Sequence, residues 1–275
     1  MKQEIKHSVV ALATTMLISC GQTQSTQNSK DTFSQQKVSS QETSSPQTKT
    51  DDSNLKVLQA QIGQSPYFSP EQEKFHVRYD LLNAKKSRTA AEEEQMQDAL
   101  AHLEDPTRSQ WDILGEGGGY LETSMKLKSV SSTLKPEGKA NYEAKNLFDN
   151  LRNTAWVEGA KGQGIGEYIE LSVPKKSNAE AKDETIIDVF NGYSQNPATY
   201  KKNSRVKKFK LYVNGQAIAI LDLQDTPNRQ TFDIEKLAIP KNVDLTYKFE
   251  ILDVYKGDKY EDTAITELNL GHHVH

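Results

Sequence analysis

Residues 146–173 read NLFDNLRNTAWVEGAKGQGIGEYIELSV, and this stretch decides the fold. It begins with a polar turn that carries Asp149 and Thr154, followed by Trp156, whose large ring is typical of a buried position. Four glycines within eight residues, at positions 159, 162, 164 and 166, then predict a tight loop. The stretch ends in alternating apolar and polar residues, the pattern of a half-buried strand. It therefore predicts the rim and the first core strands of a β-sandwich.

The same alternation recurs at short spacing through the rest of the chain. Candidate strands lie at residues 125–134, 167–173, 185–190, 206–213, 217–223, 231–234, 243–254 and 263–270. Between two of them, Asn214 and Gly215 form a pair typical of a two-residue hairpin. About eight short antiparallel strands in ~150 residues are typical of a sandwich or jelly roll. The predicted fold class of residues 119–271 is therefore mainly β, an antiparallel jelly-roll β-sandwich, with Trp156 in its core and its indole N–H hydrogen-bonded.

The N-terminus has the pattern of a targeting segment. Residues 1–20 combine a basic start with an apolar run too short to span a bilayer as a helix. The run ends in Leu-Ile-Ser-Cys at positions 17–20, which resembles the lipobox of bacterial lipoproteins and contains the single cysteine of the chain. That resemblance implies cleavage before Cys20, lipidation of Cys20, and a lipid-anchored place in the bacterial cell envelope, on the outer membrane or cell surface of a Gram-negative cell. The alternative is an ordinary signal peptide followed by a chance cysteine.

Two segments separate this signal from the sandwich. Residues 21–54 are polar with almost no aliphatic side chains, which predicts a disordered tether. Residues 55–118 form a small helical region in which residues 87–103 carry one apolar face and Thr89 is placed to cap the helix. The last four residues, 272–275, form a tail. We expect the helical region to pack on the sandwich, because it is too short for an independent core.

Composition and motifs argue against nucleic-acid binding and catalysis. A net charge of −4 over 275 residues is too small to imply a nucleic-acid partner. The lysine-rich stretch at 201–210 could suggest a polyanion site, but its lysines partly alternate with core residues, which favours a solvated sheet face. The glycines at 162–166 precede a strand, whereas a dinucleotide loop follows one. Neither a Gly-x-Ser-x-Gly elbow nor a His-Glu-x-x-His helix is present. We therefore expect a protein that is not an enzyme; a hydrolase with an unrecognised site is the weaker alternative.

Several motifs together carry a family resemblance. They are NLFDN at 146–150, TAWVEG at 154–159, GIGE at 164–167, NGY at 191–193, NSRVK at 203–207, VYKGDKYEDTAI at 254–265 and TEL at 266–268. Over residues 129–270 the chain resembles the NADase-type glycan-binding domain, a discoidin-like (factor V/VIII type C) member of the galactose-binding-like superfamily. The WDILGEG segment at 111–117 also resembles a segment that precedes this domain, but its usual cysteine pattern is replaced by Gly118, Gly119 and Tyr120.

This resemblance implies a non-catalytic lipoprotein whose sandwich binds a glycan or glycoconjugate. The rival interpretation is an interaction or scaffolding module of the cell envelope with a protein partner. The resemblance also implies a structural calcium ion, because positions matching Asp149, Thr154 and Glu267 supply its oxygens in carbohydrate-binding relatives. Leu151 departs from that pattern, since relatives often have an aspartate there. The alternative at this turn is a hydrogen-bonded turn without metal, and no other cofactor is expected.

We expect the glycan on loops at one end of the sandwich, at residues 156–166, 191–205 and 255–262. A sugar needs aromatic surface for its apolar ring face and polar groups for its hydroxyls. The candidate aromatic residues are Tyr193, Tyr200, Tyr255 and Tyr260, and the candidate polar residues are Glu158, Asn191, Asn203 and Arg205. The alternative for the tyrosines is edge packing in the sandwich, and for Arg205 an ion pair with a nearby acid.

Overall fold

The structure is a computed structural model that describes residues 52–103, 108–113, 125–138, 140–176 and 184–272. These residues belong to one compact unit, Lys49–His275. The predicted signal peptide with Cys20, nearly all of the predicted tether and the end of the tail lie outside the described residues. Among the helices of the described part, none is long and apolar enough to cross a bilayer.

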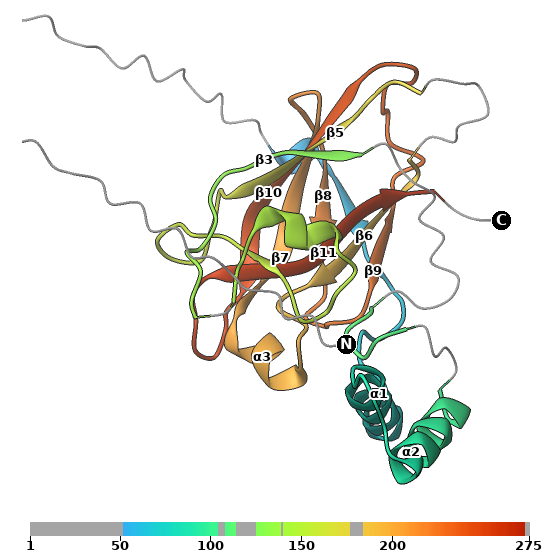
Figure 1. Cartoon of the computed structure of the whole chain (residues 1–275). Coiled ribbons are helices and arrows are strands. Elements are labelled where there is room, and N and C mark those ends of the chain that lie inside the picture. The colour runs from blue at the N-terminus through green and yellow to red at the C-terminus, as the bar shows by residue number, and fades with distance from the viewer. Residues whose placement is uncertain (1–51, 104–107, 114–124, 139, 177–183, 273–275) are drawn as a thin grey trace, which may run out of the picture. The chain divides into compact units, whose positions relative to one another are not determined.

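Eleven strands form a sandwich of two layers that meet at one corner (Figure 1). One layer pairs β3 (Lys126–Val130), β5 (Tyr168–Val173), β10 (Leu245–Tyr255), β7 (Ser204–Val213), β8 (Gln216–Asp222) and β1 (Lys56–Gln59), in that order. The other contains β4 (Trp156–Val157), β11 (Thr263–Gly271), β6 (Ile186–Asn191), β9 (Gln230–Asp233) and β2 (Gln61–Ile62). The layers join where β11 pairs with β7, at Thr263 opposite Ser204. This pairing and that of β1 with β8 are parallel, whereas the other pairings are antiparallel.

The predicted fold class is confirmed, and all eight candidate strands are present with shifted ends. The hairpin at Asn214 and Gly215 is also confirmed, because both residues have positive φ, 49° and 81°, as a two-residue turn of this kind requires. β1, β2 and β4, each of which has four residues or fewer, were not predicted from the sequence. These short strands are fixed by pairing with distant partners, which leaves no local alternation to detect.

The core lies between the two layers and is built from the inward positions of alternating strands. Along β5 and the first part of β10, half-buried and buried residues alternate strictly, as the period of two requires. Phe209 and Phe249, on the paired strands β7 and β10 of one layer, meet edge to face within the core, with ring centroids 5.9 Å apart. Trp156 is fully buried, and its indole N–H donates to the Ser132 carbonyl at 3.1 Å, which confirms the prediction for this residue.

The helical region contains two helices, α1 (Pro70–Asn83) and α2 (Ala90–Ala101). The second lies within the predicted helix and begins at Thr89, which forms a reciprocal capping box with Glu92. The first begins with the same device at Ser69, which the sequence analysis did not identify. Short helical turns also occur at η1 (Asp52–Asn54), η2 (Ala144–Phe148) and α3 (Pro197–Lys202).

Arg152, in the turn before β4, joins this region to the sandwich. Its side chain is nearly buried, forms an ion pair with Glu73 of α1 and donates from Nε to the Gln110 carbonyl at 2.7 Å. Its guanidinium lies 5.4 Å from the centre of the Trp111 ring. Ile113 is fully buried, and its amide donates to the Asn150 carbonyl at 3.2 Å.

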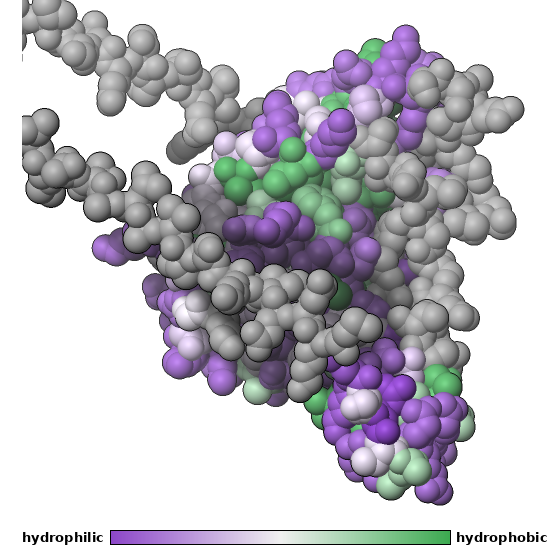
Figure 2. Space-filling view, in the orientation of Figure 1, coloured by the Kyte–Doolittle hydropathy of each residue, from purple (hydrophilic) through white to green (hydrophobic). Residues whose placement is uncertain are grey.

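The described surface is mostly hydrophilic, as Figure 2 shows, with a hydrophobic area in the region between β3 and η2. Partly buried side chains of both elements, Val130 of β3 and Phe148 of η2 among them, pack against the core. Isolated exposed apolar side chains such as Leu81 and Ile165 occur elsewhere. Scattered exposure of this kind is ordinary for a folded domain.

Candidate functional site

A cavity of about 200 Å³ opens at the end of the sandwich where β7 and β11 begin. Its lining residues come from strand ends and connecting loops, where a rigid β-scaffold usually carries binding groups. They are three tyrosines, two carboxylates, a lysine, two other polar residues and two aliphatic ones: Tyr142, Tyr193, Tyr260, Glu137, Asp262, Lys202, Thr199, Asn203, Leu134 and Val157. Aromatic surface beside a few polar groups is typical of a small-molecule site.

The first wall of the cavity lies between Leu134 and Tyr142, both of which hydrogen-bond to β4. The Leu134 amide donates to the Val157 carbonyl at 2.9 Å, and the Val157 amide donates to the Tyr142 carbonyl at 3.4 Å. Between these contacts, Glu137 and Ala140 are joined by two backbone hydrogen bonds of 3.1 and 3.0 Å. Both backbone groups of Val157 therefore hold Leu134 and Tyr142 at the cavity.

The floor of the cavity is a small apolar cluster separate from the main core. Leu134, Tyr142 and Tyr193 pack there against three buried residues: Ala155, Val157 and Ala264. The Tyr193 hydroxyl also donates to the Asn153 carbonyl at 3.0 Å. Because packing already orients the Tyr142 and Tyr193 rings, a ligand that stacks on them costs little side-chain entropy.

The opposite wall consists of the C-terminal end of α3 and the turn before β11. The Asn203 side chain donates from Nδ2 to the Thr199 carbonyl at 2.9 Å, which ends the helix. The Tyr260 amide then donates to the Lys202 carbonyl at 2.8 Å, which holds the turn against the helix end. Gly257 permits this close approach, because a Cβ there would lie 2.5 Å from the Lys202 carbonyl oxygen.

The cavity has negative electrostatic character. Burial raises the pKa of Asp262, and the neighbouring charges of Glu137 and Glu261 raise it further, although its own backbone amide opposes this shift. Burial also raises the pKa of the Tyr142 hydroxyl, with Glu137, Tyr260 and Asp262 adding to the effect. These shifts have the direction expected when carboxylates share a partly desolvated space.

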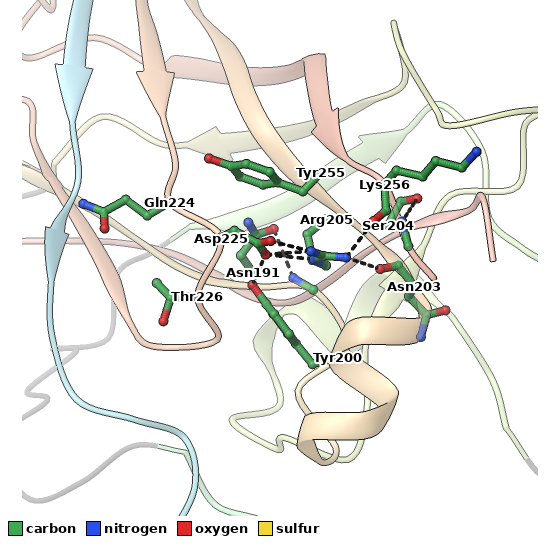
Figure 3. A network of polar contacts seen from close by, with 12 residues as sticks. Asn191, Tyr200, Asn203, Ser204, Arg205, Gln224, Asp225, Thr226, Tyr255 and Lys256 are labelled. Atoms are coloured by element: carbon green, nitrogen blue, oxygen red, sulfur yellow. Dashed lines mark hydrogen bonds and ion pairs between the residues drawn. The ribbon is translucent and has the colours of Figure 1, made fainter. Parts of the chain in front are cut away.

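Arg205, at the start of β7, forms an internal ion pair with Asp225 (Figure 3). Its Nε and NH2 groups donate to the Asp225 carboxylate at 2.6–3.0 Å. NH1 donates to the carbonyls of Asn203 and Lys256, both at 3.1 Å, so all of its N–H groups have partners inside the protein. The Tyr200 hydroxyl donates to the same carboxylate at 3.0 Å, and its ring centre lies 5.2 Å from the guanidinium.

Three of the eight residues predicted to contact glycan, Tyr193, Asn203 and Tyr260, line the cavity. Tyr200 and Arg205 belong to the internal network with Asp225 and do not line it. The other three, described next, also have internal partners and do not line it: Glu158, Asn191 and Tyr255. The ion pair with an acid that was considered as the alternative for Arg205 is therefore present.

Glu158 is fully buried and holds the glycine loop to the start of β11. One carboxylate oxygen accepts from the Thr263 amide at 3.1 Å and the other from the Ala160 amide at 2.8 Å. Burial raises its pKa, and these two hydrogen bonds oppose that shift. Gly164 packs directly on this side chain, since a Cβ there would lie 2.6 Å from Glu158 Cγ. Glu158 therefore has a structural role.

Asn191 and Tyr255 also have internal partners. The Asn191 side chain is buried and hydrogen-bonds both backbone groups of Val206. Its Oδ1 accepts from the Val206 amide at 3.0 Å, and its Nδ2 donates to the Val206 carbonyl at 2.7 Å, which links the end of β6 to β7. The Tyr255 hydroxyl donates to the Leu223 carbonyl at 3.0 Å.

The turn at residues 149–154 is closed by its own side chains. Thr154 Oγ1 donates to the Asp149 carboxylate at 2.9 Å, and the Asn150 amide donates to Glu267 at 2.7 Å. Burial and then the nearby Asp149 raise the pKa of Glu267 well above its usual range. Two carboxylates side by side fit a cation, but hydrogen bonds already use their oxygens. Within the described residues, no group of three or more His, Cys, Asp or Glu is placed to hold a metal. Calcium binding here stays a prediction.

The sequence analysis missed several cavity residues and the partner of Arg205. Asp262 lies within a loop that was predicted to bind, but its side chain was not singled out. Lys202 likewise lies within a loop that was predicted to bind, 191–205. Glu137 and Tyr142 gave no local signal, because their place depends on the backbone hydrogen bonds that Leu134 and Tyr142 form with Val157 of β4. Asp225 lies 20 residues after Arg205, and nothing between them indicates the pair.

Comparison with known proteins gives one family. No curated protein matches the chain. A family model described as the NAD glycohydrolase translocation F5/8 type C domain matches residues 119–271, which contain nearly all of the sandwich and every lining residue of the cavity. Because this match covers more than half of the chain, the protein belongs to the family of the NAD glycohydrolase translocation F5/8 type C domain.

Proposed function

We propose that the sandwich is a carbohydrate-binding module and that a sugar ring enters the cavity beside Tyr142, Tyr193 and Tyr260. Membership of a discoidin-like family makes the domain a binding or interaction module. The observation that carries the glycan proposal is the lining of the cavity, where three tyrosines stand beside Asn203, Asp262 and Glu137. Flat aromatic rings suit the apolar face of a pyranose, and carboxylate and amide groups suit its hydroxyls.

Binding without turnover is the second part of the proposal. The tyrosine hydroxyls, the Asn203 amide and the two carboxylates supply hydrogen bonds, and none of these roles requires a bond to break. We expect the sugar to leave the cavity unchanged. Incubation of bound oligosaccharide with the chain, followed by mass analysis of the sugar, tests this directly, and release of shorter products would contradict it.

A glycan array probed with the full chain tests the binding proposal. Tyr260→Ala removes a ring whose residue is 41% exposed, so we expect this variant to fold and to lose most of its glycan affinity. The matched control is Tyr255→Ala, which removes a tyrosine outside the cavity and leaves glycan binding in place. Thermal melting of both variants checks the fold. If neither the parent chain nor the control binds glycan and a protein partner co-purifies, the domain is better explained as an interaction module.

We further propose that the mature protein is held to the bacterial cell envelope by lipid on Cys20. The support is the lipobox-like Leu-Ile-Ser-Cys at positions 17–20 after an apolar run, followed by a polar stretch with the composition of a tether. Mass spectrometry of the membrane-extracted protein is expected to find an acylated N-terminal cysteine. Persistent membrane association of a Cys20→Ala variant would contradict this anchor.

A further inference from the structure

The cavity contains fixed negative charge without an internal counter-ion. Glu137 and Asp262 both line it. The salt bridges among the described residues include neither of these carboxylates, nor the lining lysine Lys202. Lys202 belongs to the exposed last turn of α3, and its long side chain reaches solvent freely. Glu137 is also exposed, whereas Asp262 is half-buried just before β11, so the negative charge that stays in the cavity is that of Asp262.

The aromatic lining adds to this preference for positive charge. The face of a tyrosine ring is the negative part of its quadrupole and attracts an ammonium group. Tyr260 already shows this interaction, because the Lys259 ammonium lies 4.6 Å from its ring centre. Tyr142 and Tyr193 line the same cavity with their rings packed on its floor. Carboxylates and tyrosine faces in one space form a site for a cation.

We propose that the cavity selects amino sugars with a free ammonium group, which pairs with Asp262 and Glu137 while the sugar ring lies against the tyrosines. This inference rests on the proposed function and names the class of glycan. A neutral sugar would leave the half-buried Asp262 carboxylate uncompensated in a partly desolvated space, with the exposed Glu137 beside it, whereas an ammonium compensates this charge through charge-assisted hydrogen bonds. An anionic sugar would meet both carboxylates and is excluded by repulsion.

The test compares two ligands that differ at the amino group, which is free and charged in one and acetylated and neutral in the other. Isothermal titration of the full chain uses oligosaccharides of glucosamine and of N-acetylglucosamine of equal length, at neutral pH and low salt. We expect the glucosamine oligomer to bind at least about tenfold more tightly, the effect of one hydrogen bond between charged groups. The preference should shrink as salt is added, because ionic screening weakens attraction at an open site.

Two matched variants identify the charge responsible. Asp262→Asn keeps the size of the side chain and the backbone carbonyl that accepts from the Ser204 amide, so the fold is expected to stay intact. We expect this variant to lose the preference for the glucosamine oligomer, so that the ratio of the two affinities, rather than either affinity alone, is the readout. The control is Glu261→Gln, which removes a carboxylate next in sequence but outside the cavity lining, and it should keep the preference.

The possible failures are distinguishable. Equal or tighter binding of the acetylated oligomer would overturn the inference and leave glycan binding in place. A preference that survives in Asp262→Asn would also overturn it, because the carboxylate would then not be its source. Binding of neither oligomer, together with no signal on the glycan array, would overturn both the inference and the proposed function.

Discussion

Arg205 has the chemistry expected of a ligand contact, but its role in this fold is structural. In the sequence it ends a predicted rim loop that also contains tyrosines, which is what a sugar site requires. The fold instead directs its guanidinium to Asp225 and to two backbone carbonyls, so no N–H remains for a ligand. The Tyr200 ring and hydroxyl complete the same interior unit. We infer that this unit fixes the start of β7, against which the cavity is built.

Asp225→Asn is expected to destabilise the protein without removing a ligand contact. The Arg205 side chain is nearly buried, and loss of the carboxylate leaves its cation without a counter-charge. Because the Asp225 side chain is 41% exposed and water can replace part of the pair, we expect a loss of about 1–2 kcal/mol in free energy of unfolding. Urea denaturation measures it. Asp253→Asn, which breaks the exposed pair with Lys207, serves as the control and should change little.

Glu267 is the residue at which the calcium prediction can be decided. It is buried beside Asp149; burial first and then the charge of Asp149 raise the pKa of Glu267, and a calcium ion between the two carboxylates would offset the second cause. If calcium takes that place, a concentration of 100 times its dissociation constant adds about 2.7 kcal/mol to the stability. We expect the melting temperature to rise with calcium, to fall with EDTA, and to respond to neither in Glu267→Gln.

The control for this experiment is Glu143→Gln, at an exposed carboxylate paired with Lys145 away from the turn, and it should keep the calcium response. An unchanged melting temperature of the parent chain with calcium and with EDTA would mean that the turn is held by its hydrogen bonds alone.

At the scale of elements, long strands were predictable and short ones were not. The strands β5, β7 and β10 have six to eleven residues whose alternation indicates one buried face. β4 has only two residues, and it is a strand because β11 pairs with it. The site follows the same rule: the loops at the rim were predicted, but which of their side chains turn inward depends on tertiary hydrogen bonds such as those of Arg205 and Glu158.

Gly192 determines how β6 leads into the cavity. It has φ +73°, and its amide donates to the Ala264 carbonyl at 3.1 Å. A Cβ at this position would lie 2.6 Å from Arg205 Cγ and 2.7 Å from a Tyr200 ring carbon. The residue must therefore be glycine both for its backbone angle and for space.

Gly192→Ala is expected to cost about 1–2 kcal/mol for the left-handed backbone and a further ~1–3 kcal/mol for overpacking. Gly215→Ala is the control, because that residue also has positive φ but a Cβ there would contact nothing within 4 Å, so only the first cost applies. Thermal denaturation of the two variants compares these costs. Equal destabilisation of the two variants would show that the side chains around Arg205 shift to accommodate the added methyl group.

At the scale of the whole molecule, the sandwich is completed from both ends of the described chain. β1 pairs with β8 and β2 with β9, at partners more than 150 residues away in the sequence. The sequence analysis assigned these residues to the helical region, since pairing over such a distance leaves no local signal. Sheet edges that would otherwise be open are thereby covered by the segment that precedes α1.

This arrangement predicts that two N-terminal truncations differ in their effect on stability. A chain that begins at Lys49, the first residue of the compact unit, keeps both strands and should have the same melting temperature as the full chain. A chain that begins at Gln64 loses Leu58, which is buried against the core, and uncovers the β8 edge at Leu221. Burial of one leucine contributes about 1.5–3 kcal/mol, and each kcal/mol shifts the melting temperature of a domain this size by about 2–4 °C.

Differential scanning calorimetry of the two truncated chains and the parent compares these melting temperatures directly. We expect the shorter chain to melt several degrees lower and to bind its glycan with unchanged affinity at a temperature where it remains folded, because neither strand lines the cavity. A shorter chain as stable as the parent would mean that β1 and β2 only rest on a sandwich complete without them. A lower melting temperature together with weaker binding would instead show that the covered edge supports the cavity across the sheet.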